Sequence, residues 1–242
     1  MIGLSGGVDS AVIAVLCRDI FNKKNARCVF LPDKATPNLD IKHKEILVKK
    51  FDLNCKTKDI TKLVENYKKY CFKKPDKMTI ANIKARIRMA IVYEYANTTN
   101  SLVCGTSNKS EILLGYFTKY GDGGVDIMPI GDLYKTQIYR LAKFLKIPQE
   151  MINKPPTAGL IKGQTDKDEL KLDYKTIDII LSGLENKLDH KKIAKNAGVK
   201  LSEVERIKKM RIKNQHKRRA PMIPKIGTRT SGLDWRSPVL EG

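Results

Sequence analysis

The chain has 242 residues, of which 41% are hydrophobic, and a formal net charge of +21. This length suits one large α/β domain with a substantial core. No apolar run approaches the ~18 residues that a membrane-spanning helix needs, and no secretory signal precedes the first motif, so we expect a soluble, cytoplasmic protein without a membrane partner.

The positive charge predicts polyanionic partners, either nucleic acid or small phosphorylated substrates. The lysines are spread along the whole chain, which is typical of a solvated surface rather than of a nucleic-acid-binding tail. The five cysteines are odd in number and form no C-x-x-C pair. We therefore expect reduced thiols rather than a zinc site or a disulfide framework.

Short apolar runs alternate with longer amphipathic ones in the first half of the chain. The expected strands are Met1–Leu4, Arg27–Leu31, Asn54–Lys58 and Ser101–Cys104. The expected helices are Ala11–Phe21, Leu39–Phe51, Ile60–Tyr70 and Met78–Asn97. Strands that alternate with helices predict an α/β fold, with a doubly wound parallel sheet and helices on both faces.

The pattern changes after Gly105. A glycine-rich stretch, Gly115–Gly131, precedes a helix predicted over Lys135–Leu145. The stretch from Pro155 to Asp168 has two prolines, two glycines and no periodicity, which predicts a loop that acts as a lid. Three further helices are expected near Tyr174–Leu181, His190–Asn196 and Ser202–Lys213. The simplest layout is a single domain, 1–242, with a helical C-terminal extension.

The strongest motif is Ser5-Gly6-Gly7-Val8-Asp9-Ser10, between a strand end and a helix start. The glycines let the backbone approach an anion, and the loop amides, the serine hydroxyls and the helix N-terminus converge on one place. This predicts a phosphate-binding loop. The alternative is a capped helix after a tight turn, in which Asp9 and Ser10 serve only as caps.

The loop lacks the spacing of the P-loop and resembles the S-G-G-x-D-S signature of the ATP pyrophosphatases. Those enzymes cleave ATP between the α- and β-phosphates and adenylate a substrate. The resemblance implies that Asp9 holds Mg²⁺ on the departing pyrophosphate.

Further motifs narrow the resemblance to one family. They are Gly105–Glu111, Gly115–Asp126, Lys135–Gln137, Pro155–Leu160, Gly163–Asp166 and His216–Arg219. In this order, from Gly3 to about Pro221, the chain resembles the ammonia-dependent NAD synthetase family. The string Gly115–Gly124, G-Y-F-T-K-Y-G-D-G-G, is the most specific part. Members usually carry a helix and a full strand before the glycine loop, so we expect a single synthetase domain that is shortened at its N-terminus relative to them and has no glutaminase domain.

The resemblance implies a two-step reaction. The nicotinate carboxylate of nicotinic acid adenine dinucleotide (deamido-NAD) attacks the α-phosphate of ATP, and ammonia then displaces AMP to give NAD. It also implies a homodimer, Mg²⁺ as cofactor and no nucleic-acid partner. The ATP contacts implied are Gly3, Leu4, Ser5, Gly6, Gly7, Val8, Asp9, Ser10, Thr106, Lys135 and Thr157. The deamido-NAD contacts implied are Arg86, Lys119, Asp126, His216 and Lys217. The catalytic residues implied are Asp9, Glu111 and Lys135, and the metal ligands are Asp9 and Glu111.

The residues alone leave alternatives open at several of these positions. Glu111 can be read as an exposed helix carboxylate, and Lys135 as a solvent-exposed lysine at a helix start, where the helix dipole disfavours a cation unless an anion is near. Lys119 and Asp126 can belong to an ordinary turn. Arg86 and Arg88 are two apart on a helix and do not share a face, so one is expected to serve substrate and the other structure.

Two competing functions fit parts of the sequence. The segment Ile193–Lys213 resembles a DNA-binding helix-turn-helix, but two packed helices with a glycine between them also recur in structural roles. That function leaves Ser5–Ser10 unexplained. A pyrophosphatase that adenylates RNA, such as a tRNA-modifying enzyme, suits the positive charge but not the string Gly115–Asp126.

Overall fold

The computed structural model describes residues 1–157 and 166–231. Its sheet has three parallel strands, β1 (Ile2–Leu4), β2 (Arg27–Phe30) and β3 (Asn54–Thr57), in the order β1-β2-β3. On the other side of β1, Cys104 forms single parallel bridges to Ile2 and to Ile127. The carboxyl ends of these segments therefore meet at one edge, where open α/β folds bind ligands.

The predicted strand Ser101–Cys104 is wrong in extent, because only Cys104 takes part in bridge pairing. The amide of Val103 donates instead to Oδ2 of Asp126, at 2.7 Å. A side-chain carboxylate thus takes a donor that a regular strand would use for pairing.

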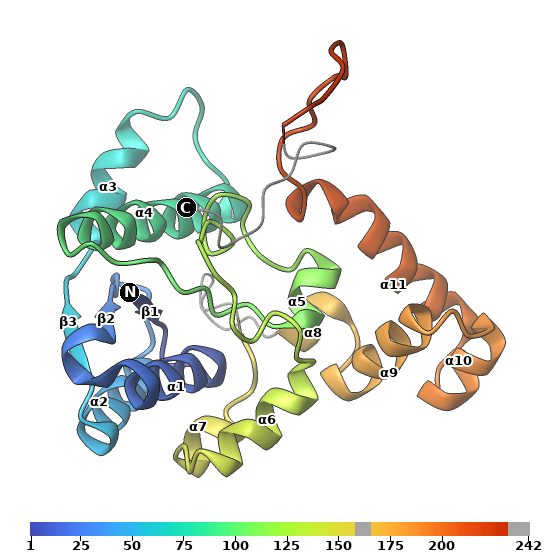
Figure 1. The fold of residues 1–242 in the computed structure, drawn as a ribbon, viewed down its shortest axis with the longest axis horizontal. Helices are drawn as coiled ribbons and strands as arrows, with labels where there is room; N and C mark the ends of the chain where they lie inside the picture. The colour runs from blue at the N-terminus through green and yellow to red at the C-terminus, as the bar shows by residue number, and fades with distance from the viewer. Residues whose placement is uncertain (158–165, 232–242) are drawn as a thin grey trace.

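Helices cover both faces of the sheet, as predicted (Figure 1). Side chains at successive strand positions point to opposite faces. Ile2, Leu4, Cys28 and Phe30 pack with α1 (Val8–Asn25), α2 (Asn38–Phe51), α6 (Lys135–Phe144) and α7 (Gln149–Asn153). Met1, Val29 and Leu31 pack with α3 (Thr61–Lys69) and α4 (Lys77–Thr98).

A separate apolar core holds the helical C-terminal region together. Its helices are α5 (Lys109–Leu114), α8 (Asp166–Leu170), α9 (Tyr174–Glu185), α10 (His190–Ala197) and α11 (Leu201–Lys213), followed by the 3₁₀ helix η1 (Asn214–Lys217). The buried side chains of Ile193, Val204 and Ile207 join this core beside α9. The helix-turn-helix-like pair α10–α11 therefore uses its apolar faces for packing.

The predicted loop from Pro155 to Asp168 is partly wrong. Its last residues begin helix α8, which buries Leu170 in the C-terminal core, and the Asp166 carboxylate accepts a hydrogen bond from the Tyr174 hydroxyl at 3.0 Å. Residues 158–165, which carry most of the predicted lid, lie outside the described residues.

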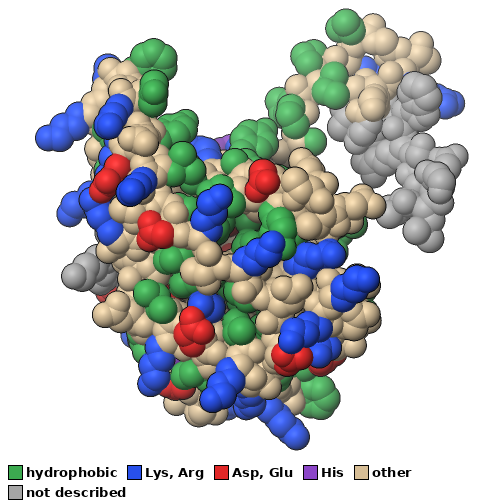
Figure 2. Space-filling model, turned by 90° about the vertical axis from the view of Figure 1, so that its left-hand side faces the viewer, with side chains coloured by type: hydrophobic (Ala, Val, Ile, Leu, Met, Phe, Trp, Pro, Cys, Tyr) green, Lys and Arg blue, Asp and Glu red, His purple; other side chains and the backbone are tan. Residues whose placement is uncertain are grey.

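The surface is basic without one basic patch on the face shown in Figure 2, where lysine and arginine side chains are spread among polar and apolar ones. Among residues 1–157 and 166–231, no helix has the length and apolar character needed to cross a membrane.

Candidate active site

The predicted phosphate loop joins β1 directly to α1. Helix α1 begins at Val8, three residues before its predicted start, so Asp9 lies in the first helical turn. Gly7 is the N-cap residue, so neither Asp9 nor Ser10 occupies the capping position. The interpretation of Asp9 and Ser10 as caps is therefore wrong.

The two serines close the loop on itself. The Ser5 amide donates to Ser10 Oγ at 3.2 Å, and the Gly7 amide donates to Ser5 Oγ at 3.2 Å. Ser10 Oγ donates to the Gly7 carbonyl at 3.0 Å. Gly6 has φ +79°, and a Cβ there would lie 2.7 Å from the Asp40 carbonyl oxygen. Only glycine fits this position.

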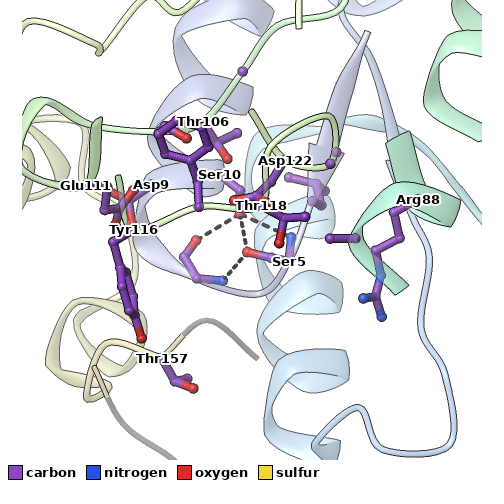
Figure 3. A pocket seen from close by; sticks show the side chains of 18 of the residues that line it. Ser5, Asp9, Ser10, Arg88, Thr106, Glu111, Tyr116, Thr118, Asp122 and Thr157 are labelled. Carbon is purple, nitrogen blue, oxygen red and sulfur yellow. Dashed lines mark hydrogen bonds between the residues drawn. The ribbon is translucent and has the colours of Figure 1, made fainter. Parts of the chain in front are cut away.

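A cavity of about 590 Å³ lies at the carboxyl edge of the sheet. The phosphate loop, the ends of β2 and of the Cys104 segment, and one side of α4 form its walls. Figure 3 shows Asp9, Glu111 and Tyr116 on one side of this space and Arg88 on the opposite side. A cavity of this size at a strand–helix junction is large enough for a nucleotide.

Three charged groups meet beside the phosphate loop. Lys135 Nζ lies 2.5 Å from Asp9 Oδ2 and 3.2 Å from Glu111 Oε1. The Lys135 side chain is 3% exposed, against 18% and 16% for the two carboxylates. The readings of Lys135 as a solvent lysine and of Glu111 as an exposed carboxylate are therefore wrong.

Asn108 fixes the other oxygens of both carboxylates. Its Nδ2 donates to Asp9 Oδ1 at 3.0 Å, and its backbone amide donates to Glu111 Oε2 at 3.3 Å. Its Oδ1 accepts the Glu111 amide at 3.1 Å, which completes a capping box at the start of α5. The fully buried Asn108 thus sets the separation of Asp9 and Glu111.

The electrostatics of this cluster follow from its burial. Burial raises the pKa of Glu111 to about 7; the ammonium of Lys135 opposes this rise and the carboxylate of Asp9 adds to it. The pKa of Lys135 is raised because the two carboxylates outweigh its burial. The cluster holds a buried cation between two acids, an arrangement that perturbs pKa values at functional sites.

The start of α6 is anchored independently of this charge cluster. The Lys135 amide donates to Ser110 Oγ at 2.9 Å, and the Thr136 amide donates to Asp178 Oδ2 at 2.9 Å. Ser110 Oγ in turn donates to Asp178 Oδ1 at 2.5 Å. The main chain that carries Lys135 is therefore tied to both α5 and α9.

One wall of the cavity is formed by tyrosines and acids. The Tyr116 hydroxyl bonds to Asp166 Oδ1 at 3.2 Å and also to Glu169. Burial raises the pKa of Asp166, against the effect of Lys135 and the two tyrosine hydroxyls. Tyr116 and Asp166 belong to the motif strings Gly115–Asp126 and Gly163–Asp166, whereas Glu169 lies outside both. The family resemblance implies no role for these three side chains.

The opposite end of the cavity holds Arg88, Thr118 and Asp122 (Figure 3). Arg88 Nε donates to the Leu31 carbonyl at 2.9 Å, and burial lowers the pKa of its guanidinium. Desolvation by the surrounding residues raises the pKa of Asp122, although the residue itself is exposed, and its carboxylate accepts a hydrogen bond from the Thr118 amide at 2.9 Å. Of the two arginines on α4, Arg88 rather than Arg86 lines the cavity. The helical spacing predicts that only one of them faces substrate; the family resemblance implies that this is Arg86, which is not part of the cavity lining.

Most of the predicted ATP-binding and catalytic residues come together in this cavity. Those that line it are Gly3, Leu4, Ser5, Gly7, Val8, Asp9, Ser10, Thr106, Glu111, Lys135 and Thr157. The remaining loop residue, Gly6, packs against Asp40.

Of the five residues predicted to bind the dinucleotide, one lines the cavity and four do not. Lys217 lines the cavity, and its Nζ donates to the carbonyls of Gly115 at 2.7 Å and Phe117 at 2.8 Å.

The other four residues of this group lie outside the cavity lining. Arg86 donates to the Lys119 carbonyl at 3.3 Å. Asp126 accepts from the Tyr93 hydroxyl at 3.0 Å and from the Val103 amide. His216 is exposed on η1. Their role towards substrate stays a prediction.

Within the two described ranges, no cluster of three or more His, Cys, Asp or Glu side chains has the arrangement of a metal site. Asp9 and Glu111 form a pair only. Mg²⁺ in nucleotide sites commonly takes one or two carboxylates and completes its shell with phosphate oxygens and water. A pair beside a phosphate loop is therefore a sufficient protein contribution.

Comparison with known proteins agrees with the geometry. The sequence model of the family described as NAD synthase matches residues 1–221. The NH₃-dependent NAD⁺ synthetase of Methanocaldococcus jannaschii is 41% identical over 229 residues, which cover 93% of this chain and 88% of that protein. The corresponding protein of Thermoplasma volcanium is 42% identical over 221 residues, covering 91% of this chain and 88% of its own length.

Solved structures with the same fold carry related names. An NMN synthetase from Francisella tularensis superposes with a TM-score of 0.81 at 34% identity, covering 92% of this chain and 87% of that one. An NH₃-dependent NAD synthetase from Campylobacter jejuni superposes with a TM-score of 0.77 at 32% identity, covering 93% and 88%. The family match and these relatives show that the chain belongs to the NAD synthase family of ligases.

Proposed function

We propose that this chain makes NAD by amidating deamido-NAD with ammonia at the expense of ATP. The observation that carries the proposal is the meeting of Asp9, Glu111 and Lys135 beside the phosphate loop, in one cavity of a chain that belongs to the NAD synthase family. Curated relatives with this activity cover nearly the whole chain.

The chemistry proceeds in two balanced steps. A carboxylate oxygen of the nicotinate attacks the α-phosphorus of ATP and pyrophosphate leaves, which gives an acyl adenylate. Ammonia then attacks the activated carbonyl, the bond to the adenylate oxygen breaks, and AMP leaves with that oxygen. A proton lost by the attacking nitrogen balances the second step.

The residues of the cavity act by positioning and by charge. The loop amides and the first turn of α1 offer donors to phosphate oxygens. The Lys135 ammonium, already buried at the cavity wall, supplies positive charge close to the same phosphates. Neither step requires a nucleophilic side chain, so catalysis rests on orientation and electrostatic stabilisation.

Mg²⁺ is part of the proposal, and the residues fit it. Two carboxylates converge on the single Nζ atom of Lys135, so one compact cation can lie between them. Asp9 and Glu111 would hold the ion. When bound, it supplies positive charge to the pyrophosphate that leaves.

The proposed dinucleotide site extends from the cavity onto the adjoining surface. Lys217 faces the cavity, whereas Arg86, Lys119 and Asp126 lie on the adjoining surface. A dinucleotide is long enough to place its reactive carboxylate in the cavity and its other half on that surface, so both groups can belong to one extended substrate site.

A homodimer and a cytoplasmic location complete the proposal. Leu102 and Ile127 are large, exposed apolar side chains beside the hydrogen-bonded residues Val103 and Asp126, and a second copy would cover such a surface. Sedimentation of the purified chain tests the dimer. A reducing compartment suits the five free cysteines.

A second candidate substrate is the deamidated mononucleotide. The NMN synthetase structure has the higher TM-score of the two structures compared above, 0.81 against 0.77. Both reactions amidate a nicotinate carboxylate through ATP. They differ in whether the substrate carries an adenylate half.

One experiment separates these candidates. Purified chain is incubated with ATP, Mg²⁺ and ammonium, and with deamido-NAD, nicotinate mononucleotide, bulk tRNA or no partner, and AMP and pyrophosphate are measured. The proposal predicts pyrophosphate release that depends on deamido-NAD, with NAD as product. Release that depends on the mononucleotide or on tRNA instead would contradict it.

A further inference from the structure

Lys135 occupies the position that a metal ion would need between Asp9 and Glu111. Its Nζ holds Asp9 Oδ2 at 2.5 Å and Glu111 Oε1 at 3.2 Å. The other two carboxylate oxygens are taken by Asn108. A compact cation can therefore reach the two carboxylate oxygens that contact Lys135 by displacing a single protein group, the Lys135 ammonium.

The two partners of the carboxylates differ in mobility. Asn108 is fully buried, caps α5 and contributes a backbone donor, so it cannot leave without unwinding the helix start. Lys135 reaches the carboxylates through a flexible side chain with four rotatable bonds. Its main chain is fixed by Ser110, so the ammonium can move while the helix start stays in place.

When both carboxylates are ionised, their charges require a cation at this point. Two largely buried carboxylates that face each other without a cation would repel and lose solvation. Lys135 neutralises them in the absence of metal, and the ring of Tyr174, 5.3 Å from Nζ, gives the ammonium a further favourable contact. When a divalent cation enters, a lysine left in place would repel it.

We propose that Lys135 is an exchangeable placeholder, whose ammonium occupies the Asp9–Glu111 site until Mg²⁺ arrives with ATP and then moves to the phosphates. This rests on the proposed function, since it assumes that ATP and Mg²⁺ use this cavity. Nucleotide phosphates favour the exchange of the ammonium for Mg²⁺ in two ways: they contribute ligands to the metal, and they give the displaced ammonium a new anionic partner. Lys135 thereby makes metal binding depend on nucleotide.

Metal binding without nucleotide tests this directly. Mn²⁺ binding is measured by electron paramagnetic resonance on the full chain, with and without a non-hydrolysable ATP analogue. Wild type is expected to bind Mn²⁺ weakly alone and tightly with the analogue. Lys135→Met removes a unit positive charge a few ångström from the site, so it should bind Mn²⁺ alone at least about tenfold more tightly than wild type.

Matched variants assign the effect to this site. Lys143→Met removes an exposed lysine from the same helix and should leave Mn²⁺ binding unchanged. Lys135→Met combined with Asp9→Asn should lose the gain. If Lys135→Met unfolds, Mn²⁺ should restore its fold, because the metal replaces the missing charge, and Lys135→Gln, which can still donate a hydrogen bond, provides a second variant.

The outcomes distinguish the two levels of the proposal. Wild type that fails to bind Mn²⁺ with the analogue contradicts the proposed metal and nucleotide site. Wild type that binds the pair, together with Lys135 variants that bind Mn²⁺ alone no more tightly than wild type, overturns the placeholder role and leaves the proposed function standing. The placeholder role is also overturned if Lys135→Met stays unfolded in the presence of Mn²⁺ while Lys135→Gln folds and binds Mn²⁺ alone no more tightly than wild type.

Discussion

Asn108 is the side chain whose removal tests the architecture of the site most sharply. It caps α5 through the Glu111 amide and also donates to the Asp9 carboxylate. Loss of an N-cap costs about 1 kcal/mol, and loss of a hydrogen bond to a charged group about 1.5–3 kcal/mol. Asn108→Ala should therefore lower the free energy of unfolding by roughly 2–4 kcal/mol, which for a chain of this length lowers Tm by roughly 5–15 °C.

A second substitution separates the two roles of Asn108. Serine is also a good N-cap but is too short to reach Asp9. Asn108→Ser should therefore be about 1 kcal/mol more stable to unfolding than Asn108→Ala but should recover no catalytic function. Pyrophosphate release should fall about a hundredfold in both variants, because displacement of a catalytic group by about 1 Å has that effect. Asp173→Ala removes the N-cap of α9, where the side chain accepts the Thr176 amide, and serves as the matched control. It should lose about 1 kcal/mol and keep activity.

Thermal melts and pyrophosphate release are measured on the same preparations. The reasoning is refuted if Asn108→Ser releases pyrophosphate at the wild-type rate, since Asp9 would then not depend on Asn108. It is also refuted if Asn108→Ala and Asp173→Ala lose equal stability, since the bond to Asp9 would then contribute nothing.

Three further predictions address single residues. Asp9→Asn should abolish pyrophosphate release while a thermal melt shows a folded chain, because Lys135 keeps Glu111 as its partner; near-normal release at saturating Mg²⁺ would count against its role. Because burial raises the pKa of Glu111 from 4.5 to about 7, the folded state binds a proton more tightly and its stability should fall as pH rises from about 4.5 to 7. Glu111→Gln should make this fall smaller in melts across that range, and an unchanged slope would contradict it. Lys119→Ala should weaken the binding of deamido-NAD far more than the binding of ATP in separate titrations, and equal losses of affinity for the two ligands would exclude a role of Lys119 in dinucleotide binding.

The local parts of this site could be predicted from the sequence. The phosphate loop is one contiguous string, and its strand–helix setting follows from the apolar run before it and the periodicity after it. Lys135 and Glu111 are different, because they lie 126 and 102 residues from Asp9 along the chain. No periodicity joins such distant positions, and only the family resemblance placed them at one site.

The errors have physical causes that a single sequence does not reveal. Val103 was expected to pair as a strand, but the carboxylate of Asp126 takes its amide. Asn108 and Asp122 lay inside strings that were singled out, yet their roles depend on contacts with distant residues. Asp166 was expected in a loop, and burial of Leu170 in the C-terminal core makes the segment helical.

The central claim is that a carboxylate is activated as an acyl adenylate in this cavity and then captured by ammonia. The most direct measurement follows oxygen: deamido-NAD labelled with ¹⁸O in its nicotinate carboxylate is converted with ATP, Mg²⁺ and ammonium, and the products are examined by mass spectrometry. The account predicts NAD and AMP in equal amounts, with one labelled oxygen in the AMP phosphate and none in pyrophosphate. AMP without label, or label in pyrophosphate or inorganic phosphate, would contradict it.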